Sequence, residues 1–280
     1  MSAHSWQEIG AGVFQLPCPT YHLNVTAVLG EHGVLVVDTR ASLAEGRELR
    51  AELRALTSAP VAWVVNSHLH FDHTFGNAEF VPPRQVPGAQ LWAHVNAIGQ
   101  YPAYAAQARA ELIAEGGAAA LAMDEQEFAV PQHAVREHAV IDLGGRVAEL
   151  SYHGRGHTDG DIAILVPDAG VLVAGDLMKE HGKPGYWPDC YPLEWPATLA
   201  SVLTLAGPGT VIVPGHGRAV GAGFAAGQQA ELQAVADEIT RLHRAGVPAE
   251  QALAEGSWPY DSPRLPTAVR RGYAALNDGA

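Results

Sequence analysis

Three things are scarce in this sequence: cysteine, basic side chains and long apolar runs. Of 280 residues only Cys18 and Cys190 are cysteines, so no disulfide framework is needed and the composition fits a reducing cytoplasm. Lysine and arginine total 17 against 30 acidic residues, a net charge of −13. This balance argues against nucleic acid as a partner, because phosphate backbones are bound by basic clusters. No apolar run approaches the length of a membrane span, and the N-terminal residues lack the basic start and apolar stretch of a secretory leader. We therefore expect a cytoplasmic chain with neither a nucleic-acid nor a membrane partner.

The hydrophobic pattern alternates between β-type runs and amphipathic helices along most of the chain. In the first half it predicts strands at 13–16, 24–29, 34–37, 61–65 and 91–94, and helices at 42–56 and 103–122, the second interrupted near 116–117. In the second half it predicts strands at 139–143, 146–152, 162–166, 171–174 and 210–213, and helices at 197–206 and 232–242. This order indicates a mixed α/β layer architecture. With no linker visible, we expect one domain over 1–280, with its core at about 10–245 and an irregular tail at 246–280 that ends in a short helix.

The most distinctive stretch of the sequence follows directly on the apolar run 61–65. It carries His68, His70, Asp72 and His73 within six residues. In an extended strand alternate side chains face the same side, so the first three would project together. His73 joins them only if the chain turns there. Imidazole and carboxylate groups are ligands of Zn2+ and related divalent ions, and the pattern therefore predicts a metal site.

Three further candidate ligands each follow a predicted strand and stand beside glycine. They are His157 in a glycine-rich turn, Asp176 after Gly175, and His216 in the sequence Pro-Gly-His-Gly. Glycine lets the backbone bend sharply and approach an ion without obstruction from a side chain. An aspartate after a strand is usually a turn residue, but three such positions together with the first stretch indicate a shared site.

Taken in chain order, these motifs resemble the metallo-β-lactamase superfamily. The matching residues are His68-x-His70-x-Asp72-His73, then His157 in Gly-His-Thr, Asp176 in Ala-Gly-Asp and His216 in Pro-Gly-His-Gly. The resemblance covers roughly residues 10–245. It implies an α/β fold of the αβ/βα type, a four-layer sandwich of two mixed β-sheets flanked by helices, with the active site at one edge.

The resemblance also implies how the candidate ligands would be shared between two cations. One cation would be held by His68, His70 and His157, the other by Asp72, His73 and His216, and Asp176 would bridge them. This corresponds to two Zn2+ per chain, with Mn or Fe possible because the same ligands accept them.

This ligand set carries its own chemistry. Two cations on the order of 3.5 Å apart share a water and lower its pKa enough to supply hydroxide at neutral pH. The metal-bridging hydroxide is the nucleophile, and a cation polarises the scissile carbonyl. We therefore expect a dinuclear metal-dependent hydrolase acting on a small ester, thioester, lactone or lactam. Asp72 could orient the nucleophile or pass a proton to the leaving group. Asp38 and Thr39 could hold an imidazole N–H or simply cap their strand.

The residue at position 176 distinguishes branches of the family. Zinc β-lactamases that use a cysteine ligand have Cys where this chain has Asp176, and a complete set with this aspartate is more similar to glyoxalase II and the lactonases. Against glyoxalase II itself, the first stretch reads Asn-Ser-His-Leu-His rather than Thr-His-His-His. Two alternatives stay open: a β-lactamase-type activity, and a mononuclear iron oxidoreductase resembling persulfide dioxygenases, which use fewer ligands.

Substrate selection is expected on the segment between Leu177 and Pro196, which is rich in aromatic residues, proline and glycine. Such a loop directly after a ligand is typical of a pocket wall. Tyr186 or Tyr191 could donate to the oxyanion as catalytic groups. The alternative is that these aromatic side chains, like Cys190, pack against the sandwich or against the partner in a homodimer. The helix predicted at 103–122 is a second candidate wall.

Overall fold

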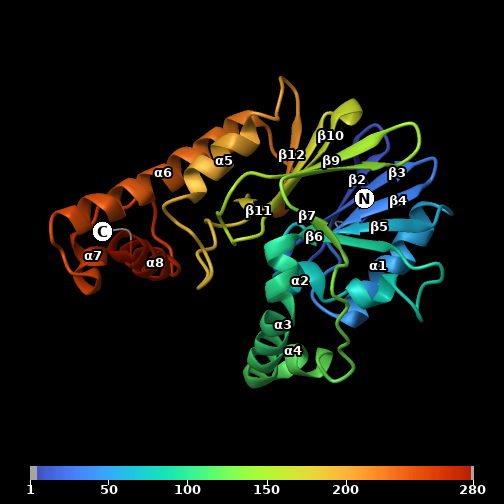
Figure 1. Cartoon of the computed structure of the whole chain (residues 1–280), viewed down its shortest axis with the longest axis horizontal. Helices are drawn as coiled ribbons and strands as arrows, with labels where there is room; N and C mark the ends of the chain where they lie inside the picture. The colour runs from blue at the N-terminus through green and yellow to red at the C-terminus, as the bar shows by residue number, and fades with distance from the viewer. Residues whose placement is uncertain (1–4, 279–280) are drawn as a thin grey trace.

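Two β-sheets packed face to face form the centre of the computed structural model, which describes residues 5–278 (Figure 1). The first sheet has its strands in chain order and is antiparallel from β1 to β4 and parallel from β4 to β7. Its strands are β1 (Gln7–Gly10), β2 (Val13–Pro17), β3 (Asn24–Gly30), β4 (Gly33–Val37), β5 (Val61–Val65), β6 (Gln90–His94) and β7 (His133–Val135).

The second sheet runs β12-β11-β10-β9-β8, antiparallel except for the parallel β11–β12 pair. Its strands are β8 (His138–Asp142), β9 (Val147–Tyr152), β10 (Ile162–Val166), β11 (Val171–Lys179) and β12 (Val211–His216).

The sheets meet through a buried aliphatic layer to which both contribute. Val28, Val37 and Val65 come from the first sheet, and Leu150 and Ile164 from the second. All five are fully buried or nearly so, and burial of apolar surface contributes about 25 cal/mol per Å². This layer fixes the relative position of the two sheets, and therefore of the loops at their ends.

Helices flank the two sheets (Figure 1). They are α1 (Leu43–Leu56), α2 (Phe71–Thr74), α3 (Val95–Glu115), α4 (Gly117–Ala122), α5 (Trp195–Leu203), α6 (Ala222–Arg244), α7 (Ala249–Glu255) and α8 (Leu265–Asp278). Helix α1 begins after Ser42, whose hydroxyl accepts from the Glu45 amide at 3.2 Å, and it buries Leu49 and Leu53 against the first sheet. Helices α5, α6 and α8 share a core cluster with the second sheet. The expected sandwich of two mixed sheets flanked by helices is confirmed.

Several local predictions are also confirmed. The turn at 30–33 joins β3 to β4 with Gly30 paired to Gly33. The expected break near 116–117 separates α3 from α4. Strand β1, by contrast, was not predicted, because its four residues alternate little and are partly exposed. Within residues 5–278, no helix is both long and apolar enough to cross a bilayer.

The helix expected at the end of the C-terminal tail is present, but the segment before it is more ordered than expected. The tail contains α7 and the 14-residue helix α8, which lie at the far end of α6 (Figure 1). Helix α8 buries Leu265, Ala268, Val269 and Tyr273 in the cluster that also holds the inner face of α6. The prolines that suggested irregular structure precede the helix or stand in its first turn, where the missing N–H costs nothing. Residues 246–278 are therefore part of the packed structure.

Candidate metal centre

The histidine-rich stretch does not continue the strand that precedes it. Strand β5 ends at Val65, and His70 is the N-cap of the short helix α2. Asp72 and His73 therefore lie on a helical turn, and the expectation of an extended chain through this stretch was wrong. The turn is held by the Thr74 hydroxyl, which lies 3.2 Å from the Leu69 carbonyl and 3.0 Å from that of His70.

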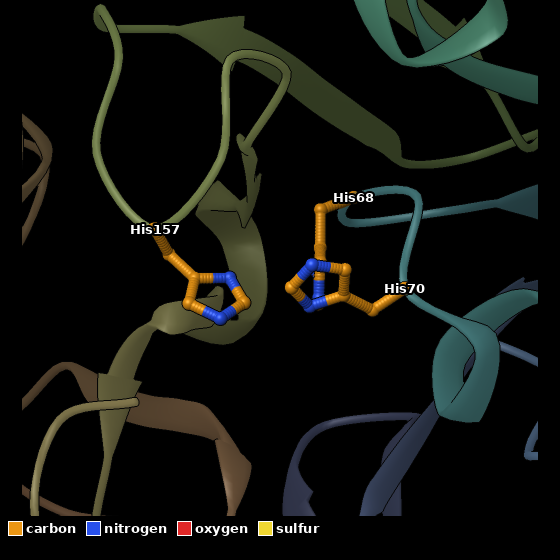
Figure 2. A group of neighbouring side chains, drawn as sticks. All are labelled: His68, His70 and His157. Carbon is orange, nitrogen blue, oxygen red and sulfur yellow. The ribbon is translucent and has the colours of Figure 1, made fainter. Parts of the chain in front are cut away.

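All seven predicted ligand side chains nevertheless converge. Ligand-type atoms lie within 4.8 Å of one another in three groups: His68, His70 and His157; His68, His73 and Asp176; and Asp72, His73 and His216. Figure 2 shows the rings of the first group pointing toward one another, two from the loop after β5 and one from the loop between β9 and β10. None of the seven side chains belongs to a residue more than 9% exposed.

Asp176 lies at the centre of the arrangement. Its Oδ1 is 3.3 Å from Nε2 of His73, and its Oδ2 is 3.2 Å from Nε2 of His216 and 3.6 Å from Nε2 of His157. Gly215 makes this position available, because a Cβ there would overlap Oδ1 of Asp176. One carboxylate thus reaches histidines from both proposed halves of the site.

Several buried atoms in this cluster have no hydrogen-bond partner among the described residues. They are Nε2 of His68 and His73, both ring nitrogens of His157, and Oδ1 of Asp176. A buried polar atom left unpaired costs about 1–3 kcal/mol, so five at one place need a common explanation. Five imidazoles and two carboxylates form the donor set that zinc prefers. The cluster therefore fits divalent cations.

The outward-facing nitrogens fix which tautomer each histidine adopts. Asp38 accepts from Nδ1 of His73 and from the Ser67 hydroxyl, both at 2.8 Å. Because Ser67 gives its only proton to Asp38, it accepts from Nδ1 of His68 at 3.0 Å. Nδ1 of His216 donates to the Tyr21 carbonyl at 2.8 Å. In their neutral form, all three histidines therefore present an unprotonated Nε2 to the cluster.

The two strand-end residues of the sequence analysis have different roles. Asp38 holds an imidazole N–H, as expected, from a left-handed backbone conformation with φ of 66°. Thr39 does not: its hydroxyl lies 2.8 Å from the Asn77 side-chain oxygen and 3.2 Å from the His73 carbonyl. It supports the backbone of the ligand turn rather than a ring.

Burial and mutual charge set the protonation of the cluster without a cation. Burial disfavours a charged His73, but the carboxylates of Asp38, Asp72 and Asp176 outweigh it and raise the pKa of His73 well above its ordinary value. Burial would likewise raise the pKa of Asp176, yet the neighbouring histidines, led by His216, hold it well below the usual range. Burial and the surrounding imidazoles lower the pKa of His68. In the absence of metal, protons supply the positive charge that the carboxylates require.

Two contacts of the site were missed by sequence reasoning. Asp189 Oδ2 lies 3.0 Å from Nε2 of His70, and Tyr21 supplies the carbonyl for His216 from a left-handed conformation, φ 59°. Neither residue belongs to a motif. Asp189 does lie in the segment expected to form a pocket wall, and Tyr21 precedes β3 in a short 3-10 turn.

Two aromatic rings lie beside His70, and one of them comes from the segment between Leu177 and Pro196. Trp187 lies edge-on to His70 with ring centroids 6.4 Å apart. Tyr104, on α3 within the second candidate wall, stacks on the same ring with centroids 5.5 Å apart. His70 is therefore in contact with two aromatic rings as well as with the Asp189 carboxylate.

The expected oxyanion donors are engaged elsewhere. Tyr186 is fully buried, and its hydroxyl shares a hydrogen bond of 3.1 Å with Tyr260. The ring of Tyr191 lies 4.4 Å beneath the guanidinium of Arg155. Cys190 is also fully buried, and burial raises the pKa of its thiol to about 12. The Tyr186 hydroxyl is therefore engaged inside the core, and the half-buried ring of Tyr191 packs against a guanidinium.

Comparison with known proteins agrees with the geometry. The family model described as the metallo-beta-lactamase superfamily matches residues 20–216. The chain belongs to the metallo-beta-lactamase superfamily. All seven residues of the His/Asp cluster lie within the matched range.

Curated relatives in the superfamily differ in what they act on. The chain is 33% identical over 79 residues to metallo-beta-lactamase type 2 of Bacillus cereus, covering 28% of this chain and 31% of the lactamase. It is 26% identical over 191 residues to the 2,4-dinitroanisole O-demethylase subunit alpha of a Nocardioides species, covering 68% and 51%. The chain thus spans about a third to a half of the length of these relatives.

Solved structures share the fold at low identity. A metallo-beta-lactamase from Pontibacter korlensis superposes with a TM-score of 0.64 at 21% identity, over 82% of this chain and 98% of that one. A sec-alkylsulfatase from a Pseudomonas species superposes with a TM-score of 0.73 at 18% identity, over 97% of this chain and 50% of that one.

Proposed function

We propose that this protein is a dinuclear hydrolase that takes two divalent cations, zinc by ligand preference. His68, His70 and His157 would hold one cation and Asp72, His73 and His216 the other, with the Asp176 carboxylate within reach of histidines from both groups. The observation that carries the proposal is the set of buried, unpaired nitrogens and the Asp176 oxygen that face a common centre. Such atoms are costly unless a cation or protons occupy the space between them.

When bound, the two cations would supply hydroxide at neutral pH and stabilise charge that develops on the substrate. The chain itself contributes orientation and proton handling. Asp38, Ser67 and the Tyr21 carbonyl hold three imidazoles in the ligating tautomer. Asp72 is the candidate proton carrier. Its Oδ2 lies inside the cluster, 3.5 Å from Nε2 of His216 and 3.7 Å from Nε2 of His73.

The walls of the site favour a substrate with an apolar or aromatic group. Tyr104 and Trp187 flank His70, and Tyr21, 44% exposed, packs edge-on against Phe71 with ring centroids 5.4 Å apart. Rigid aromatic faces bind apolar groups with little loss of side-chain entropy. We therefore propose small esters, thioesters, lactones or lactams with such a group as the substrate class.

The test combines metal analysis with a substrate panel. Purified protein should contain or take up two equivalents of zinc and then hydrolyse members of a panel of thioesters, lactones and β-lactams. Alkyl sulfates and an aryl methyl ether belong in the panel, because an alkylsulfatase and an O-demethylase are among the relatives. One equivalent of iron with oxygen consumption would favour the oxidoreductase alternative. Absence of any bound metal would refute both.

A further inference from the structure

A carboxylate outside the seven-residue ligand set contacts one of the ligands directly. Asp189 Oδ2 lies 3.0 Å from Nε2 of His70, and the Asp189 side chain is one third exposed. Because an ionised carboxylate can only accept a hydrogen bond, Nε2 of His70 carries the proton. Nδ1 is then the nitrogen of His70 that is left for a cation, whereas His68 and His73 present Nε2.

The segment 187–191, which carries Asp189, touches ligand loops from both halves of the chain. Trp187 lies edge-on to His70. At the other end of the segment, the Tyr191 amide donates to the Gly156 carbonyl at 2.8 Å, directly before His157. The segment therefore joins the loop after β5 to the loop between β9 and β10.

Helix α8 and the residue before it hold this segment from outside. Arg271 donates from Nε to the Cys190 carbonyl at 2.9 Å, next to Asp189 in the chain. Arg264 places its guanidinium 3.6 Å from the ring centroid of Trp187. Both arginines lie beyond residues 20–216, the part that matches the family model.

We propose that Asp189 is a positioning residue of the metal centre, which fixes His70 in the tautomer that ligates through Nδ1, and that α8 holds Asp189 in place through Arg271. The proposal rests on the proposed function, since it requires His70 to bind a cation. Partners that orient a metal-binding histidine typically change metal affinity by about 10- to 100-fold, and this is the size of effect expected here.

The experiment measures zinc affinity of the full chain by competition with a chromophoric chelator. Asp189→Ala should weaken one of the two equivalents by about 10- to 100-fold. Asp189→Asn keeps an acceptor of the same shape and should weaken it less. Asp168→Ala is the matched control, because it removes a carboxylate that pairs with Arg146 at 2.9 Å on the surface. Nitrogen chemical shifts of His70 in the zinc-loaded protein report its tautomer directly. A general loss of stability would not change that tautomer.

A second pair of variants tests the role of the helix. Arg271→Met should lower zinc affinity several-fold, whereas Arg270→Met should not, because the hydrogen bond that the Arg270 side chain makes among residues 5–278 goes to Thr267 within α8. Thermal unfolding of each variant in excess chelator shows whether the metal-free fold is intact. Loss of affinity in Arg271→Met with an unchanged metal-free unfolding temperature supports the proposal.

The outcomes separate this proposal from the function on which it rests. If the wild-type protein binds two equivalents of zinc and Asp189→Ala binds both within twofold of wild type, the positioning role is refuted and the hydrolase function stands. An unchanged nitrogen spectrum of His70 in Asp189→Ala refutes it equally. If the wild-type protein itself binds no zinc, the proposed hydrolase function is refuted, and the positioning role of Asp189 is refuted with it.

Discussion

Replacing Asp38 by asparagine should move the ring proton of neutral His73 from Nδ1 to Nε2, the nitrogen that faces the metal centre. Asp38 is 2% exposed, and its carboxylate accepts from the Ser67 amide, the Ser67 hydroxyl and Nδ1 of His73, each at 2.8 Å. Asparagine has nearly the same shape and tolerates the left-handed backbone at this position. Its amide nitrogen, however, is a donor, so at least one of the three donors that face the side chain must lose its partner, rotate or change its tautomer.

The magnitude follows from these contacts. If the amide oxygen stays with the Ser67 amide, the NH2 group faces Nδ1 of His73, which must then become an acceptor and move its proton to Nε2. That proton occupies the position needed by a cation. We expect zinc affinity to fall about 10- to 100-fold, equivalent to about 1.4–2.8 kcal/mol. If the amide flips, a buried amide donor of Ser67 is left unpaired and the metal-free fold loses about 1–3 kcal/mol instead.

The assay distinguishes these results. Zinc affinity is measured by chelator competition, and the unfolding free energy by urea titration in excess chelator. Asp168→Asn, an exposed ion-pair residue, should change the unfolding free energy by less than about 1 kcal/mol and leave zinc affinity as it is. If Asp38→Asn matches wild type in both measurements, then Asp38 does not set the tautomers and this account of the site is wrong.

Three further predictions follow. Asp176→Ala should lower metal content and turnover by about 100-fold or more while the far-ultraviolet circular dichroism stays that of the wild type; full metal content would remove Asp176 from the site. Zinc affinity should rise from about pH 6 to about pH 8. Burial disfavours a charged His73, but the carboxylates, led by Asp38, outweigh it and raise the pKa of metal-free His73, so zinc must displace a proton from this ring. For the same reason His73 stabilises the metal-free protein fully below its unfolded pKa, and this contribution is lost as pH rises through the folded pKa; flat pH profiles of affinity and of metal-free stability would contradict the assignment. Tyr186→Phe should cost about 1 kcal/mol of stability through the lost bond to Tyr260 and leave the turnover number within about twofold, whereas a large fall in turnover would restore Tyr186 as an oxyanion donor.

The motifs of the sequence were sufficient to predict the fold and the residues that converge. Glycine beside His157, Asp176 and His216, and four candidate ligands within six residues, are local signals that do not depend on tertiary structure. The conformation of the stretch 66–74 was not predictable in this way, because the Thr74 side chain and the packing of Phe71 favour a helical turn over the extended chain that alternation suggested.

Contacts over long sequence separations were not predictable. Asp189 reaches His70 across 119 positions, and nothing in its neighbours distinguishes it from a surface aspartate. Tyr186 and Tyr191 looked equally suited to a pocket wall, and only the packing around Tyr260 and Arg155 shows where they point. A short helix at the C-terminal end was expected, but its 14-residue length and the helix α7 before it were not, because the nearby prolines suggested irregular structure.

The proposed ligands are divided between the two sheets of the sandwich. The loop after β5 supplies His68 and His70, and the loop between β9 and β10 supplies His157. A cation bound by this trio would cross-link the two sheets at the open end of the sandwich. Slow hydrogen exchange at that end would then depend on metal content, and neither half of the chain, expressed alone, would hold the ion.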